Sequence, residues 1–104
     1  MPFASAYKLA SHFDAHGHEF GAASEEEYER IADAFMSQTL HPNLYGCIRT
    51  NADRDRLLLD GIIGYFGIAY GVLTLRTFYT KSQEEIAHAG GAAKFVARKC
   101  LEKR

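Results

Sequence analysis

The apolar positions before residue 40 recur with the spacing of two α-helices. Over Ala6–His16 the apolar side chains fall three and four positions apart, which predicts a helix that Gly17 ends. Ser24, with Glu27 three positions later, is a capping box and predicts the start of a second helix that ends near 37–38. The buried stripe expected for this second helix is Tyr28, Ile31, Ala32 and Phe35.

From Leu44 onward the pattern changes to short apolar runs separated by polar or glycine turns, which is typical of strands. We predict strands over 44–50, 56–59, 65–69 and 73–79, and the short turns between them favour antiparallel neighbours. Strict alternation along the last strand divides its side chains between two faces. One face has Leu73, Leu75, Thr77 and Tyr79, and the other has Thr74, Arg76 and Phe78.

The chain ends in a further helical segment. Ser82 to Glu85 is a second capping box, and Gly90–Gly91 should break or bend the helix before it resumes over 92–102. A length of 104 residues suits one domain, 1–104, and a hydrophobic fraction of 47% supplies a core. The predicted fold class is α+β, with two N-terminal helices packed on a four-stranded antiparallel sheet and a C-terminal helix.

The cysteines and the hydropathy of the chain indicate the cellular compartment in which it is found. No apolar stretch approaches the roughly 20 residues that cross a bilayer, and the first residues lack a secretory pattern. We therefore expect a soluble, cytoplasmic protein without a membrane partner. Cys47 and Cys100 are far apart and form no CxxC pattern, so we interpret them as two reduced thiols, with one long-range disulfide as the alternative.

The net charge of −1 is unevenly distributed. Residues 1–48 carry two basic and seven acidic side chains, a net charge of −5, whereas residues 49–104 carry ten basic and six acidic side chains, a net charge of +4. A basic half suits an anionic partner such as RNA. Two halves of opposite sign also attract each other, so charge alone does not choose between these interpretations.

His12 and His16 lie four positions apart, so a helix presents them on one face. Two histidines are half a zinc site, and a third ligand would have to come from Glu19 or from another histidine. His16 could also cap the helix end. The remaining interpretation is acid–base chemistry, because histidine serves as base and acid near neutral pH. The guanidinium groups suited to bind phosphate beside it are Arg49, Arg54, Arg56 and Arg76.

Several segments, taken in order, resemble the barnase–EndoU–colicin–RelE-like nuclease superfamily, in particular its phage-associated and contact-dependent-inhibition toxin domains. The first is His12–Phe13–x–x–His16–Gly17–x–Glu19–Phe20–Gly21, followed by Tyr28 and Ala32–x–x–Phe35. The others are Leu57–Leu58–Leu59–Asp60, Phe66–Gly67–Ile68 and Leu75–Arg76–Thr77–Phe78–Tyr79. The resemblance covers about residues 8–81 and leaves 82–104 as an extension.

The resemblance implies a ribonuclease toxin that cleaves RNA, often tRNA, without a metal or other cofactor. It also implies an immunity or antitoxin partner, and action in the cytoplasm of the cell itself or of a target cell. The alternatives are a non-catalytic binding or structural module of the same fold, and a zinc protein that uses the two histidines.

The resemblance also implies roles for particular residues. His16 would be the general base or acid, and His12 would orient it. Thr77 and Tyr79, on one face of the last strand, would position the phosphate or assist proton transfer. The predicted phosphate and RNA contacts are Arg49, Arg54 and Arg76.

Overall fold

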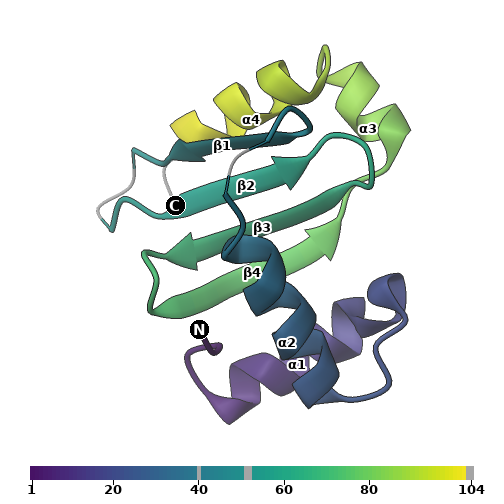
Figure 1. Ribbon diagram of the computed structural model, residues 1–104, viewed down its shortest axis with the longest axis vertical. Helices are drawn as coiled ribbons and strands as arrows, with labels where there is room; N and C mark the ends of the chain where they lie inside the picture. Colours follow the sequence, from purple (N-terminus) through teal and green to yellow (C-terminus); the bar gives the residue numbers. More distant parts are fainter. Residues whose placement is uncertain (40, 51–52, 103–104) are drawn as a thin grey trace.

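A four-stranded antiparallel sheet lies at the centre of the computed structural model, which describes residues 1–39, 41–50 and 53–102. The strands β1 (Leu44–Ile48), β2 (Arg56–Asp60), β3 (Tyr65–Tyr70) and β4 (Thr74–Thr80) stand in sequence order (Figure 1). Each neighbouring pair is antiparallel, as the short turns predict. The α+β fold class is therefore confirmed.

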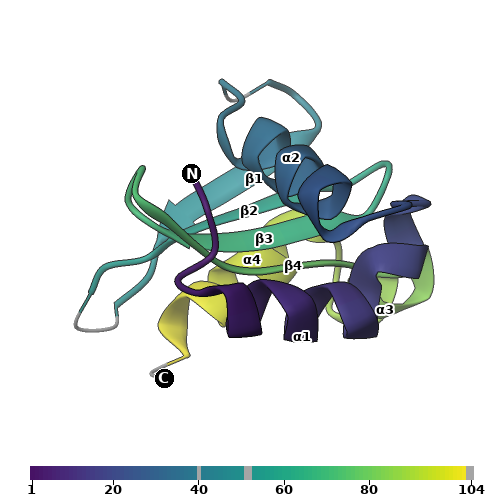
Figure 2. The same ribbon diagram turned by 90° about the horizontal axis from the view of Figure 1, so that it is seen from below.

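Helices precede and follow the sheet. The first are α1 (Ala6–His16) and α2 (Glu25–Met36), separated by a 3₁₀ turn, η1 (Gly17–Phe20). The last are α3 (Gln83–His88) and α4 (Ala92–Leu101), so the predicted C-terminal helix is interrupted where Gly90 and Gly91 adopt φ values of 98° and 106°. Helix α2 covers one face of the sheet, α4 lies behind β1 and β2, and α1 runs beside β4 (Figures 1 and 2).

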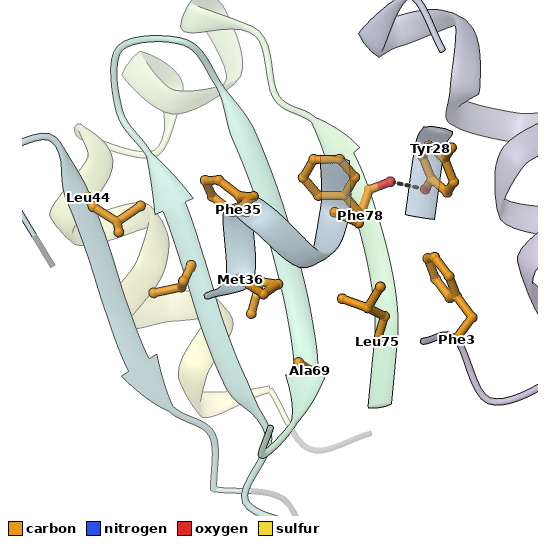
Figure 3. Close-up of a cluster of buried hydrophobic side chains, with 10 residues drawn as sticks. Phe3, Tyr28, Phe35, Met36, Leu44, Ala69, Leu75 and Phe78 are labelled. Atoms are coloured by element: carbon orange, nitrogen blue, oxygen red, sulfur yellow. Dashed lines mark hydrogen bonds between the residues drawn. The ribbon is translucent and has the colours of Figure 1, made fainter. Parts of the chain in front are cut away.

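Two apolar clusters fill the two sides of the sheet. The first cluster packs α2 and the N-terminal segment against one face and includes Tyr28, Phe35 and Phe78 (Figure 3). The second packs α4 against the other face and includes Leu57, Leu59 and Phe95. Because Leu58 faces the first cluster while its neighbours in β2 face the second, this strand reads as an unbroken apolar run.

The two serines predicted to cap helices, Ser24 and Ser82, accept the expected backbone hydrogen bonds. Ser82 accepts a hydrogen bond from the backbone of Glu85, whose carboxylate accepts one from the backbone of Ser82, which completes that capping box. At α2 the Ser24 hydroxyl accepts from Glu27 N at 3.1 Å, but the Glu27 carboxylate accepts from Ala23 N instead of from Ser24. The second half of the first capping box is therefore shifted by one residue.

Helix α1 ends at His16 as predicted, but the glycine after it acts differently from the prediction. Gly17 has a right-handed φ of −55°, and the left-handed residue is Gly21 at the end of η1, with φ of 65°. Gly17 is required for space, because a Cβ there would lie 2.5 Å from the Phe13 ring.

Strand β4 contains a bulge that breaks the predicted alternation. Ile68 pairs with Thr77, but Ala69 pairs with Leu75, so Arg76 is an extra residue on the β4 side. Leu75 therefore packs in the first cluster, while Thr77 lies on the opposite face. The prediction that Leu75 shares a face with Thr77 is wrong, because one inserted residue reverses the direction of the side chains.

Three segments outside the sheet bind backbone groups along the outer edge of β4. The bonds are Leu75 N to Pro2 O (2.7 Å), the Tyr28 hydroxyl to Phe78 O (2.5 Å) and Thr80 N to Glu19 Oε1 (2.7 Å). An uncovered edge strand is a template for another strand, and these bonds remove that template at β4.

A disulfide joins Cys47 in β1 to Cys100 in α4, with the two Cα atoms 6.4 Å apart. The interpretation of two reduced thiols is therefore wrong, and the long-range disulfide is found. The error arose because 53 residues separate the cysteines in sequence, whereas α4 lies directly on the face of β1 that carries Cys47. Among the described residues, no helix combines the length and the apolar character needed to span a membrane.

Candidate functional site

The candidate site begins at the end of α1, where η1 folds Glu19 back beside His16. His16 Nδ1 lies 2.7 Å from Glu19 Oε2. The other carboxylate oxygen, Oε1, accepts hydrogen bonds from the backbone nitrogen of Thr80 at 2.7 Å and from its hydroxyl at 2.8 Å. A carboxylate at Nδ1 makes that nitrogen the donor, so Nε2 is the nitrogen that can accept a proton from a substrate.

Glu19 is ionised at neutral pH. Partial burial opposes its ionisation, but the hydrogen bonds from His16 and Thr80 outweigh that effect, so its pKa lies below the ordinary value of 4.5. The negative charge of Glu19 therefore stands beside the imidazole and holds the ring in place through Nδ1.

Tyr79 and Lys81 extend the site across β4. The Tyr79 ring stacks on the His16 ring with centroids 5.2 Å apart, and Lys81 Nζ lies 4.9 Å from the centre of the Tyr79 ring. Burial raises the pKa of Tyr79, although the charge of Lys81 acts in the opposite direction. The phenol is therefore protonated at neutral pH and can donate a hydrogen bond or a proton.

His12 lies one turn before His16 on the same side of α1. The two imidazole rings stack at 6.4 Å, and the Phe3 ring covers His12 at 5.0 Å. Burial, followed by the nearby His16 and Lys8, lowers the pKa of His12. His12 is therefore mostly neutral at pH 7 and can support His16 without placing a positive charge beside it.

Arg76 stands near His12, because both line a hollow of about 350 Å³ between α1 and β4. The Arg76 guanidinium already has acidic partners. Its Nη2 lies 2.7 Å from Asp53 Oδ2, its Nε lies 2.9 Å from Asp55 Oδ2, and the group sits over the Tyr70 ring at 5.3 Å. These contacts fix the position of Arg76 and offset its charge.

The structure does not bring Arg49 to His16. Arg49 is 8% exposed and donates from Nη2 to Glu102 O at 2.9 Å, at the C-terminal end of α4. Arg49 comes just after β1, which is three strands away from β4 in the sheet. The residue of β1 that is level with Tyr79 is Tyr45, four residues before Arg49. That register places it about 20 Å away.

The other predicted residues lie in different places. Arg54 is exposed between β1 and β2, with φ of 53°. Arg56 donates to Met36 O on the opposite face from Tyr79. Thr77 is half-buried, two residues before Tyr79 on the same face. The predicted RNA contacts of these residues stay predictions.

Two members of the site were not assigned a role in it from the sequence. The sequence predicts Glu19 only as a metal ligand or as part of the motif, although its place three residues after His16 allows a side-chain contact within one helical turn. The sequence predicts no role for Lys81, because its ion pair with Glu85 (3.3 Å) and its contact with Tyr79 depend on how α3 follows β4.

The zinc hypothesis finds no support in the geometry. In the described part of the chain, no three histidine, cysteine, aspartate or glutamate side chains come close enough together to hold a metal ion. The carboxylate beside His16, that of Glu19, binds His16 through one oxygen and Thr80 through the other.

The chain matches no protein-family model, and the searches of curated proteins and of solved structures found no significant match. The geometry of the site is therefore the basis for assigning a function, and it combines an oriented imidazole, a protonated phenol and a nearby ammonium group.

Proposed function

We propose that this chain is a metal-independent endoribonuclease that cleaves RNA, with tRNA as a candidate substrate, through attack of a 2′-hydroxyl on the neighbouring phosphodiester. The observation that carries the proposal is the His16 imidazole, held at Nδ1 by Glu19 and stacked on Tyr79. This arrangement brings together a base, His16, and a separate acid, the Tyr79 phenol, and the reaction requires both.

In the proposed step His16 Nε2 removes the proton of the 2′-hydroxyl, and the 2′-oxygen forms a bond to phosphorus. The bond from phosphorus to the 5′-oxygen breaks, and the Tyr79 phenol supplies the proton to that leaving oxygen. Lys81, next to Tyr79, stabilises the negative charge of the phosphorane. The products are a 2′,3′-cyclic phosphate and a 5′-hydroxyl.

The resemblance to toxin domains supports an immunity or antitoxin partner and action in the cytoplasm of a target cell. The disulfide between Cys47 and Cys100 favours delivery over residence, because disulfides form in oxidising compartments and are rare in the cytosol. Delivery of the chain into a target cell is therefore part of the proposal.

The test is cleavage of tRNA and total RNA by the purified chain in excess EDTA, with the products mapped. We expect cyclic phosphate ends, and no cleavage where the attacking nucleotide is 2′-deoxy. His16→Ala should lower the rate by about 10²- to 10⁴-fold, whereas His18→Ala, at an exposed neighbouring histidine, should leave it unchanged. Intact RNA in the presence of folded wild-type protein would refute the proposal.

One observation favours a second candidate, a module that binds RNA without cutting it. Two of the basic side chains near the site have carboxylate partners, since Arg76 pairs with Asp53 and Asp55 and Lys81 pairs with Glu85. Paired charges bind phosphate less strongly than free ones. RNA that is bound at micromolar protein and recovered intact would identify this function.

A further inference from the structure

The hollow of about 350 Å³ between α1 and β4 has a lining that the proposed reaction does not use. Helix α1 contributes a phenol ring, an ammonium group, a hydroxyl and an imidazole, and β4 contributes a hydroxyl and a guanidinium. The side chains are Tyr7, Lys8, Ser11, His12, Thr74 and Arg76. A hollow of this size falls within the range of small-ligand sites.

Tyr7 is the unusual member of this lining. It is 82% exposed, whereas the other aromatic side chains of α1 and η1, Phe13 and Phe20, pack against the first cluster. An aromatic ring left in water beside a polar hollow offers a flat surface on which a nucleobase can stack.

The charge around the hollow argues against a simple anion site. Arg76 is offset by Asp53 and Asp55, and His12 is mostly neutral, so Lys8 supplies most of the positive charge. One ammonium group attracts a single phosphate only weakly in water. A ligand that also presents a flat ring and hydroxyl groups would use more of the lining.

We propose that this hollow is a subsite for one nucleotide of a single-stranded RNA, next to the phosphate that His16 serves. Tyr7 stacks on the base, Lys8 pairs with the phosphate, and the hydroxyls of Ser11 and Thr74 bind the sugar or the base edge. The position of this nucleotide relative to the cleaved phosphate rests on the proposed function. The hollow adjoins His16, because His12 lines the hollow and its ring stacks on that of His16.

Binding is tested with a short single-stranded oligodeoxyribonucleotide, which lacks the attacking hydroxyl and is not cut. We expect Tyr7→Ala to raise the Kd roughly tenfold, since base stacking on an aromatic ring contributes about that factor. Lys8→Gln should raise the Kd several-fold and reduce its salt dependence. Val72→Ala and Lys94→Gln, at exposed positions outside the hollow, are the matched controls and should bind as wild type.

Cleavage kinetics provide the second measurement. With RNA as substrate, Tyr7→Ala should raise KM with kcat unchanged, because stacking is equal in ground and transition states. If the wild type does not cut RNA but oligonucleotide binding depends on Tyr7, the subsite stands and the proposed reaction fails. If RNA is cut and Tyr7→Ala changes neither KM nor Kd, the subsite is overturned. Inorganic phosphate that competes as well as a nucleoside monophosphate would also overturn it.

Discussion

At the scale of single residues, the side chains of Tyr28 and Glu19 form hydrogen bonds with backbone groups along the edge of β4. Tyr28 is fully buried, and its hydroxyl donates to Phe78 O at 2.5 Å (Figure 3). The sequence identifies Tyr28 as part of an apolar stripe, but it does not reveal the hydroxyl's partner, which lies 50 residues away.

Tyr28→Phe should lower the free energy of unfolding by about 1–3 kcal/mol, because it leaves the Phe78 carbonyl without this donor in a buried place. Urea denaturation measures the change. The control is Tyr7→Phe, which removes a hydroxyl from an exposed side chain and should change stability by less than about 0.5 kcal/mol. Equal stability of Tyr28→Phe and wild type would show that this bond adds nothing.

The residues of the site could be predicted only in part. His12, His16 and Tyr79 meet as their motif suggests, because two of them share a helix face. Arg49 was predicted to reach the phosphate, but a strand ending in arginine gives no sign that α4 will return to accept its hydrogen bond through Glu102. Sequence patterns indicate local geometry, and this contact is not local.

At the scale of elements, starts and ends follow from local chemistry. The strand ends fall within two residues of the prediction, and Ser24 and Ser82 cap the helices as expected. The bulge at Arg76 was missed, because nothing in the composition of β4 marks which residue will be left unpaired. The disulfide was missed for a related reason, since it depends on where α4 docks.

The disulfide holds α4 against β1, and its removal should destabilise the chain. Reduction, or replacement of both Cys47 and Cys100 by alanine, should lower the free energy of unfolding by about 2–4 kcal/mol, because the open chain has more unfolded conformations. Thermal unfolding with and without dithiothreitol measures the loss.

The double alanine variant serves as its own control, since dithiothreitol should not change its stability. The idea fails if oxidised and reduced wild type unfold at the same temperature. It also fails if free thiols are counted in protein purified without reductant.

At the scale of the whole molecule, the sheet separates two surroundings. Helix α2 covers one face and α4 lies on the other, while α1 runs beside β4, where His16 stacks on Tyr79 (Figures 1 and 2). Glu19 joins α1 to β4 through His16 and Thr80, so its ionisation affects how the two parts hold together.

Stability should therefore fall in acid. Because the pKa of folded Glu19 is below its ordinary value of 4.5, the unfolded chain binds the proton more tightly, and the contribution of Glu19 is complete above pH 4.5. That contribution is lost as pH falls through the lower, folded pKa. Chemical denaturation across pH 3–6 measures it, with Glu19→Gln expected to show a shallower dependence. Identical slopes for variant and wild type would contradict the assignment.

The bonds along β4 have a further consequence for self-association. A sheet whose two edges were both open could add copies without limit and form a fibre. Here Pro2, Tyr28 and Glu19 bind backbone groups of β4, so among the strands that the structure describes β1 is the edge left for another strand. Two copies that met through β1 would present a covered β4 at each end, so growth by strand addition would stop at a closed pair.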